Sequence, residues 1–339
     1  MDKAKILIVG SSKIPALELI FQNIFSKLGY NTHIFGAKDV FLRFYEYSFF
    51  NKISFRLGIS NIYSRIQKDL LTTCRLSTPD WLFVFKGMEI FPSTLKEIKS
   101  FGVKLINFNP DHPFVFSGRG SGNSNVTESI RLFDLYFSYA DDAVDSLKAF
   151  GVRSEKIPFG FDAFGFDYQP LKRVDEISRV CFLGNADKYR VQILNDLSKR
   201  GLPIDVYGEN WSDFRLHADI HHFGPKYGND FWFTLQSYAV QLNLLRPHNL
   251  NSHNMRSFDI PGSGGIMLAP MTRDHSLFFT NGKEVFLFHS IENAFSIAKY
   301  ILSLSFEERS IIRNAARICS IEKHQYEARI KKIIQYLED

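Results

Sequence analysis

Short apolar stretches recur along this chain, each separated from the next by a longer amphipathic or polar segment. In the first half, strands are expected over 5–9, 32–35, 81–85, 104–108 and 135–138, with a helix over 15–28. In the second half, strands are expected over 180–183, 204–207, 241–245, 266–268 and 285–288, with helices over 189–200, 228–238, 254–261 and 291–303. Apolar strands that alternate with helices are typical of parallel sheets covered on both faces. The sequence therefore predicts an α/β fold with doubly wound sheets.

The length of 339 residues is sufficient for two domains, each with its own core. We expect a Rossmann-like first domain over 1–160 and a Rossmann-like second domain over 176–318. Residues 161–175 show no helical or alternating period, and we interpret them as a linker. A final helix over 319–339 is expected to return to the first domain. Because ligands of such sheets bind at the carboxyl ends of the strands, two sheets that face each other would hold their ligand in a cleft.

Composition narrows the classes of function. The formal charge of +5 is modest, and no basic cluster with interleaved aromatic residues is present, so nucleic acid is not an expected partner. Three widely spaced cysteines, Cys74, Cys181 and Cys319, indicate neither a disulfide framework nor a zinc site. No apolar run reaches the roughly 18 residues of a membrane span, and the apolar start is too short for a signal peptide. We expect a cytoplasmic protein.

The segment 240–270 contains the strongest candidate ligand site. An apolar strand is followed by a polar loop that includes Asn249, a helix that begins near Met255, and a glycine-rich return to the next strand. The first turn of a helix offers unpaired N–H groups and a partial positive charge, to which Arg256 adds a full charge. We therefore expect Arg256 to bind a diphosphate and Asp259, one turn later, to bind a ribose. The simpler interpretation, an ordinary surface ion pair between these two residues, stays open.

Several motifs, taken in order, resemble the glycosyltransferases of the two-domain GT-B fold, and in particular the CgeB-like (spore maturation protein) group. The motifs are PDWLFVFKG at 79–87, FNPDHPF at 108–114, IPFGFD at 157–162, CFLGNADKYR at 181–190, VYGENW at 206–211, LNLLR at 242–246, NMRSFDIPGSGG at 254–265 and HQYEAR at 324–329. This resemblance implies transfer of a sugar from a nucleoside diphosphate sugar, with a UDP-sugar favoured. The implied acceptor is a glycan, a lipid-linked molecule or a protein.

The resemblance also implies roles for individual residues. Asp111 and His112 are the candidate catalytic bases, although an Asp before His-Pro is also a common turn former. The residues expected to bind the donor are Gly10, Lys188, Arg190, Glu209, Asn210, Trp211, Arg246, Asn251, His253, Asn254, Met255, Arg256 and Asp259. Trp211 has the alternative of packing beneath its loop. In the wider retaining group two glutamates stand where this chain has Asn251 and Asp259, so the contact with the donor sugar and the stereochemical outcome stay open.

No cofactor and no metal ion are expected in the catalytic step, because cationic side chains are predicted at the diphosphate and no Asp-x-Asp triplet follows a strand. Three alternatives remain. The chain could be a non-catalytic nucleotide-sugar or glycan-binding protein, or an enzyme of the nucleotide-sugar 2-epimerase type. Residues 40–59 combine aromatic side chains with Arg43, Lys52 and Arg56 and could rest on a membrane surface, although a helix packed on the first domain is the favoured interpretation.

Overall fold

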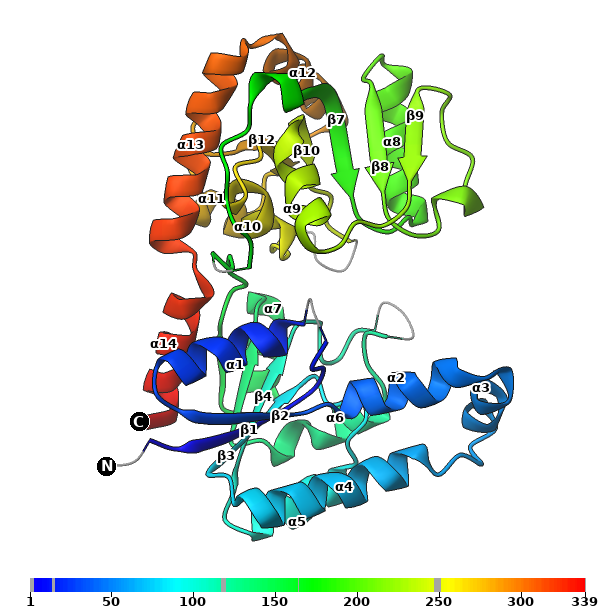
Figure 1. The fold of residues 1–339 in the computed structure, drawn as a ribbon, viewed down its shortest axis with the longest axis vertical. Coiled ribbons are helices and arrows are strands. Elements are labelled where there is room, and N and C mark those ends of the chain that lie inside the picture. Colours follow the sequence, from blue (N-terminus) through cyan, green and yellow to red (C-terminus); the bar gives the residue numbers. More distant parts are fainter. Residues whose placement is uncertain (1–2, 14–15, 117–119, 164, 247–250, 339) are drawn as a thin grey trace. The chain divides into compact units, whose positions relative to one another are not determined.

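The computed structural model describes residues 3–13, 16–116, 120–163, 165–246 and 251–338. The chain divides into two compact units, one formed by 1–158 together with 330–339 and the other by 159–329. Each unit contains a six-stranded sheet in which every pairing of neighbouring strands is parallel (Figure 1). The predicted α/β fold with two doubly wound sheets is confirmed.

The sheet of the first unit has the strand order β2-β1-β3-β4-β5-β6. Its strands are β1 (Lys5–Val9), β2 (Asn31–Phe35), β3 (Trp81–Phe85), β4 (Lys104–Asn109), β5 (Leu135–Ser138) and β6 (Ser154–Lys156). The order reverses between β1 and β3, and in open α/β sheets ligands bind beside the carboxyl ends of the strands at such a reversal. The loops that follow β1 and β3 are therefore the candidate ligand loops of this unit.

Helices cover both faces of this first sheet. They are α1 (Leu17–Lys27), α2 (Ala37–Tyr47), α3 (Phe49–Arg56), α4 (Ile62–Ser77), α5 (Pro92–Ser100), α6 (Ser124–Ser129), η1 (Ile130–Leu132) and α7 (Asp141–Ala149). On one face Phe21 of α1 packs against Phe83 and Phe85. On the other face Leu70 of α4 shares a buried cluster with Leu82. The side chains of β3 thus alternate between two apolar layers, as expected of a strand buried on both faces.

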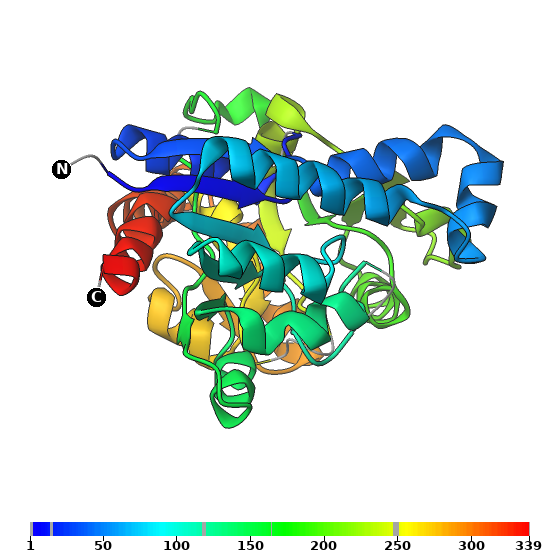
Figure 2. The ribbon, with the colours of Figure 1, turned by 90° about the horizontal axis from the view of Figure 1, so that it is seen from below.

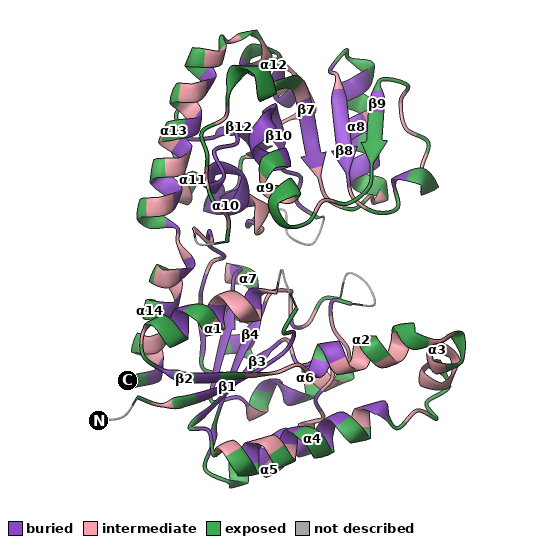
Figure 3. Cartoon of the chain, in the orientation of Figure 1, coloured by how far each residue is buried: buried purple, intermediate pink, exposed green. Residues whose placement is uncertain are grey.

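The sheet of the second unit has the order β12-β11-β10-β7-β8-β9. Its strands are β7 (Ile177–Leu183), β8 (Ile204–Tyr207), β9 (Ile220–Phe223), β10 (Tyr238–Leu242), β11 (Met267–Pro270) and β12 (Phe286–Phe288). Its helices are η2 (Arg173–Asp175), α8 (Lys188–Lys199), η3 (Trp211–Asp213), α9 (Gly228–Ser237), α10 (Arg256–Gly262), α11 (Arg273–Phe278), α12 (Ile291–Ser303) and α13 (Phe306–Lys323), and α14 (Tyr326–Glu338) is divided between the two units. The order reverses between β7 and β10, and β8, β10, β11 and β12 are buried, whereas the edge strand β9 is largely exposed (Figure 3).

The last residues of the chain, 330–339, group with the first unit. The ring of Tyr336 packs on Phe137 with centroids 6.1 Å apart. The hydroxyl of Tyr30 donates to Glu338 Oε1 at 2.7 Å, and burial together with this carboxylate raises the pKa of Tyr30 to about 12. Part of α14 therefore completes the core of a unit whose other residues come from the beginning of the sequence.

Several element boundaries differ from the expected ones. Strands β6 and β9 were not predicted, because these short edge strands carry polar residues rather than an apolar run. The strand expected over 241–245 is β10, which begins and ends earlier, and the helix expected over 319–339 is divided between α13 and α14. The segment 161–175, expected as a linker, groups with the second unit.

Some predicted features lie outside the described residues. The expected start of the first helix at Pro15 and the polar loop residue Asn249 are among them. Within the described segments no helix combines the length and apolar character needed to cross a bilayer. The cytoplasmic setting stays a prediction.

Candidate functional site

Three arginines converge at the carboxyl ends of β7 and β10, where the strand order of the second sheet reverses. Arg190 lies in the first turn of α8, Arg246 follows β10, and Arg256 begins α10. Burial lowers the pKa of Arg190 to about 10, Asp187 raises it, and the positive charges of Arg246 and Arg256 lower it further. Three like charges held this close favour the binding of an anion among them.

Arg190 and Arg256 line a common pocket together with Asn243, Asn254 and apolar residues of β7, β10 and α10. Arg190 donates to the carbonyl oxygens of Asn185, at 3.0 Å, and of Leu244, at 3.3 Å. Within the described part of the chain, the buried Nε atoms of both arginines lack a hydrogen-bond acceptor, although Arg190 Nε lies 3.4 Å from a carboxylate oxygen of Asp187. Buried donors of this kind are normally satisfied, so the pocket offers hydrogen bonds to an anionic ligand.

Asp259 holds the guanidinium of Arg256 in place. Its Oδ2 accepts from Arg256 Nη1 at 2.7 Å, and the same guanidinium lies 4.3 Å above the ring centroid of Phe231. Burial raises the pKa of Asp259 to about 6, and the charge of Arg256 lowers it. The pair is buried on the carboxylate side, so it is not the ordinary surface pair that the sequence left open. This geometry makes Asp259 a positioning residue for Arg256.

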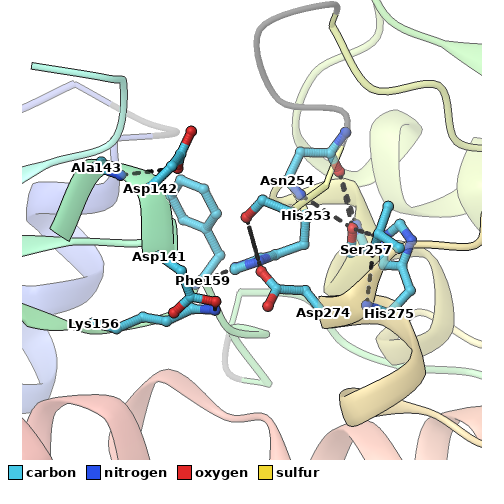
Figure 4. A network of polar contacts seen from close by, with 12 residues as sticks. Asp141, Asp142, Ala143, Lys156, Phe159, His253, Asn254, Ser257, Asp274 and His275 are labelled. Atoms are coloured by element: carbon cyan, nitrogen blue, oxygen red, sulfur yellow. Dashed lines mark hydrogen bonds and ion pairs between the residues drawn. The ribbon is translucent and has the colours of Figure 1, made fainter. Parts of the chain in front are cut away.

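The loop before α10 is fixed by a buried polar network, drawn in Figure 4. His253 Nδ1 lies 2.6 Å from Asp274 Oδ2, and both side chains are almost fully buried. The other ring nitrogen of His253 accepts the N–H of Phe159 at 3.2 Å. Because both nitrogens are engaged inside the protein, His253 positions the loop in this geometry, and its predicted contact with the donor stays a prediction.

A second part of this network caps α10. Asn254 Oδ1 accepts the N–H of Ser257 at 3.0 Å, and its amide donates to Asn243 Oδ1 at 2.9 Å. The hydroxyl of Ser257 lies 2.8 Å from His275 Nε2, while His275 Nδ1 donates to the carbonyl oxygen of Pro270 at 2.8 Å (Figure 4). The first turn of α10, which presents Arg256, is thereby tied to the start of α11.

We expect low pH to weaken the hydrogen bonds by which His275 ties α10 to α11. Burial lowers the pKa of His275 to about 4, below its value of about 6.5 in the unfolded chain. The unfolded state therefore binds more protons, so stability from this group is present above pH 6.5 and is lost as the pH falls toward 4, by about 3 kcal/mol in all. Denaturant unfolding across this range should show a shallower pH dependence for His275→Gln. The exposed control His222→Gln should match the wild type, and identical slopes for all three proteins would contradict the assignment.

The remaining predicted residues of the second unit divide into two groups. Trp211 is buried, packs on Phe182 and donates to the carbonyl oxygen of Gly184 at 3.1 Å, as in the packing alternative, and its predicted contact with the donor stays a prediction. The backbone N–H of Glu209 donates to Asn185 Oδ1 at 3.1 Å, which joins the loops after β7 and β8. The other predicted donor-binding residues are exposed or half-buried, and they are Lys188, Asn210, Asn251 and Met255.

Gly208 permits the close approach of these two loops. Its φ of 143° is in the region that favours glycine, and a Cβ there would lie 2.3 Å from the carbonyl oxygen of Gly184. Any larger residue would push apart the loops that follow β7 and β8. The pocket at the end of β7 therefore depends on this glycine.

In the first unit, Gly10 follows β1 and lies beside two carboxylates. A Cβ on Gly10 would lie 2.3 Å from Glu18 Oε1, the atom that accepts the N–H of Ser11 at 2.8 Å. Asp39 accepts from the hydroxyl of Ser11 at 2.7 Å. The position of Gly10 thus serves the packing of Glu18 under the loop, and its predicted contact with the donor stays a prediction.

The two predicted catalytic residues follow β4. Asp111 Oδ2 lies 2.5 Å from Lys86 Nζ, an ion pair that neutralises the carboxylate. His112 Nδ1 accepts the N–H groups of Phe114, at 3.2 Å, and of Val115, at 3.1 Å. Burial lowers the pKa of His112, and in this tautomer its proton is on Nε2. His112 is therefore arranged as a hydrogen-bond donor in this geometry, and its predicted role as a base stays a prediction.

Sequence reasoning missed a further carboxylate, Glu89, in the loop after β3. Burial raises the pKa of Glu89, Lys38 and Lys86 lower it, and Glu18 raises it. Its position next to the reversal between β1 and β3 was the signal that could have found it. The anchors Asp274 and His275 were also missed, although they too follow a strand end, that of β11.

The two doubly wound units have counterparts among solved structures. Solved structures with the same fold include Anabaena HepE in complex with UDP-glucose, with 13% identity, 99% of this chain and 100% of that chain covered, and a TM-score of 0.67. Sucrose-phosphate synthase from Thermosynechococcus elongatus aligns with 7% identity, 99% and 98% coverage and a TM-score of 0.68. A putative UDP-N-acetylglucosamine 2-epimerase from Listeria monocytogenes aligns with 13% identity, 99% and 96% coverage and a TM-score of 0.60. At these identities the likeness establishes the GT-B fold.

The match to a family model covers a smaller part of the chain. Residues 190–335 match the family model described as Glycosyl transferase-like, and a search of curated proteins found no match. This match, over less than half of the chain, and the shared fold support the predicted glycosyltransferase class, and the activity itself stays a prediction. Membership of the CgeB-like group stays a prediction, as does a glycan, lipid-linked or protein acceptor.

Proposed function

We propose that this chain transfers a sugar from a nucleoside diphosphate sugar to a glycan, lipid-linked or protein acceptor, with a UDP-sugar as the favoured donor. One observation carries the proposal: Arg190, Arg246 and Arg256 converge at the strand-order reversal of the second sheet, and two of them hold buried Nε atoms that find no acceptor among the described residues. A leaving diphosphate gains negative charge in the transition state, and fixed cations stabilise it. The HepE structure in complex with UDP-glucose supports UDP as the nucleotide.

The arginines supply the positive charge that a divalent ion supplies elsewhere, and we therefore propose that the catalytic step is independent of metal. No cofactor beyond the donor is part of this proposal. A thermal-shift screen against UDP, GDP, ADP, CMP and dTDP, each with and without EDTA, tests it. We expect UDP to raise the melting temperature to the same degree in EDTA. No shift with any nucleoside diphosphate would overturn the donor site, and a shift abolished by EDTA would overturn metal independence.

For the acceptor side, we propose Glu89 as the base that takes the proton of the acceptor hydroxyl. Burial raises the pKa of Glu89, which makes it a stronger base than an ordinary carboxylate, whereas the carboxylate of Asp111 is held in an ion pair with Lys86. Glu89→Gln should lower kcat for transfer by about 100-fold or more, as expected for loss of a general base, and leave UDP affinity unchanged. Asp111→Asn should lower kcat less. A larger loss of kcat in Asp111→Asn than in Glu89→Gln would instead assign the role of base to Asp111.

Two other functions are separated by product analysis. The Listeria structure described as a putative 2-epimerase shares the fold, so epimerisation is a distinct candidate. Incubation with UDP-N-acetylglucosamine alone, followed by NMR, would reveal an epimerised sugar nucleotide if that candidate were correct. UDP binding without hydrolysis, transfer or epimerisation for any sugar nucleotide would instead favour a binding protein.

A further inference from the structure

The connection between α2 and α3 and the loop after α3 form an exposed apolar surface, here called the α2–α3 tip (residues 47–59). Tyr47 is 84% exposed, Phe49 71% and Phe50 80%. Leu57 and Ile59, in the loop after α3, are 68% and 75% exposed. Within the first unit this tip projects away from the sheet, as both Figure 1 and Figure 2 show. Apolar side chains clustered in this way on a protruding element mark an interaction surface.

The tip is held in shape by a second set of aromatic side chains on its inner side. The ring of Phe41 lies 4.9 Å from that of Phe55, and Phe55 lies 5.4 Å from Tyr63 of α4. The start of α3 is capped by Ser48, whose hydroxyl accepts the N–H of Asn51 at 3.1 Å. Because the inner aromatic residues pack α2 and α3 together on α4, the outer residues stay exposed in a fixed arrangement.

The charges around the tip are mostly positive and indicate an anionic partner. The segment 40–61 contains three basic residues, Arg43, Lys52 and Arg56, and one acidic residue, Glu46. Lys52 Nζ lies 5.8 Å from the ring centroid of Tyr45, and Arg56 donates to the hydroxyl of Tyr45 at 3.3 Å. Aromatic residues suit the interface between lipid headgroups and acyl chains, while basic residues are attracted to anionic headgroups.

We propose that the α2–α3 tip docks on an anionic lipid bilayer surface, with Phe49, Phe50 and Leu57 inserted at the headgroup level and the basic residues against the headgroups. A partner protein with a matching acidic surface would need its own complementary shape, whereas a bilayer accepts short protruding apolar side chains without one. The docking is peripheral. It does not depend on the proposed sugar transfer.

Vesicle flotation of the full chain tests the proposal. We expect binding to phosphatidylserine-rich vesicles, weak binding to pure phosphatidylcholine vesicles, and loss of binding at high salt. The double variant Phe49→Ser/Phe50→Ser should bind anionic vesicles about tenfold or more weakly, because insertion of the two rings is lost. The variant Arg43→Gln/Arg56→Gln should lose the preference for phosphatidylserine while keeping residual binding. Absence of wild-type binding to any of these vesicles would overturn the proposal.

A matched control comes from similarly exposed side chains on other helices, Leu277 of α11 at 68% and Ile311 of α13 at 70%. Leu277→Ser/Ile311→Ser should bind vesicles like the wild type, and every variant should unfold at the wild-type temperature. An environment-sensitive dye on Phe50→Cys should shift to the blue on binding and a dye on Leu277→Cys should not, since the native cysteines are buried. If both double variants lost vesicle binding equally, the tip would not be the membrane contact. If the wild type formed a dimer that dissociated in Phe49→Ser/Phe50→Ser, the tip would bind a second copy of the chain instead of a bilayer.

Discussion

Replacing Arg256 with alanine is expected to weaken UDP binding by about 30- to 150-fold, which corresponds to the roughly 2–3 kcal/mol of a hydrogen bond to a charged group. The side chain lines the pocket at the end of β10, and its buried Nε lacks an acceptor within the described residues. Calorimetric titration of UDP into the wild type and Arg256→Ala measures the difference. Wild-type affinity in a folded Arg256→Ala would show that the diphosphate binds elsewhere.

The control must separate affinity from folding, because Arg256→Ala leaves the buried carboxylate of Asp259 without its cation. The double variant Arg256→Gln/Asp259→Asn removes both charges and should regain stability without regaining UDP affinity. Arg200→Ala removes a partly exposed arginine of the same unit, which pairs with Glu292, and should bind UDP like the wild type. Recovery of affinity in the double variant would mean that the loss came from unfolding.

Replacing Asp274 with alanine is expected to lower the free energy of unfolding by about 3–5 kcal/mol, because it leaves two buried donors unsatisfied at about 1–3 kcal/mol each. Asp274 Oδ2 receives hydrogen bonds from His253 Nδ1, at 2.6 Å, and from the hydroxyl of Ser252, at 2.8 Å. Removal of the carboxylate leaves buried donors without this acceptor, in the loop that leads to Arg256. UDP affinity should fall together with stability.

Denaturant unfolding of the wild type and Asp274→Ala measures this change in the free energy of unfolding. The exposed control Asp196→Ala, in the middle of α8, should change stability by no more than about 0.5 kcal/mol. A double-mutant cycle with His253→Ala isolates the pair, and we expect a coupling energy above about 1.5 kcal/mol. Additive effects of Asp274→Ala and His253→Ala would show that the two side chains act independently.

The sequence was sufficient to predict the central strands because they are buried on both faces and therefore appear as continuous apolar runs. The structure reproduces the predicted bounds of β1, β3, β5 and β8. The edge strands β6 and β9 have one open side and tolerate polar residues, so no apolar run indicated them. A local pattern identifies a strand only where burial dictates its composition.

The candidate site was predicted less completely because its contacts are long-range. Arg256 and Arg190 were identified as cations at strand ends, and the structure brings them together because β7 and β10 pair. His253 and Trp211 also lie near strand ends, but their partners come from distant segments and turn them inward. Sequence spacing indicates which loop a side chain belongs to, whereas its direction depends on partners that the fold supplies.

The grouping of residues 330–339 with the first unit affects how the protein is made. During synthesis residues up to 158 leave the ribosome before the second unit, whereas Tyr336 and Glu338, which pack on Phe137 and Tyr30, follow it. The first unit must therefore wait for translation of the entire second unit before its core is complete, unlike domains that fold one after another as they emerge. A chimera that exchanged this unit between relatives would have to exchange two segments that are separated by the second unit.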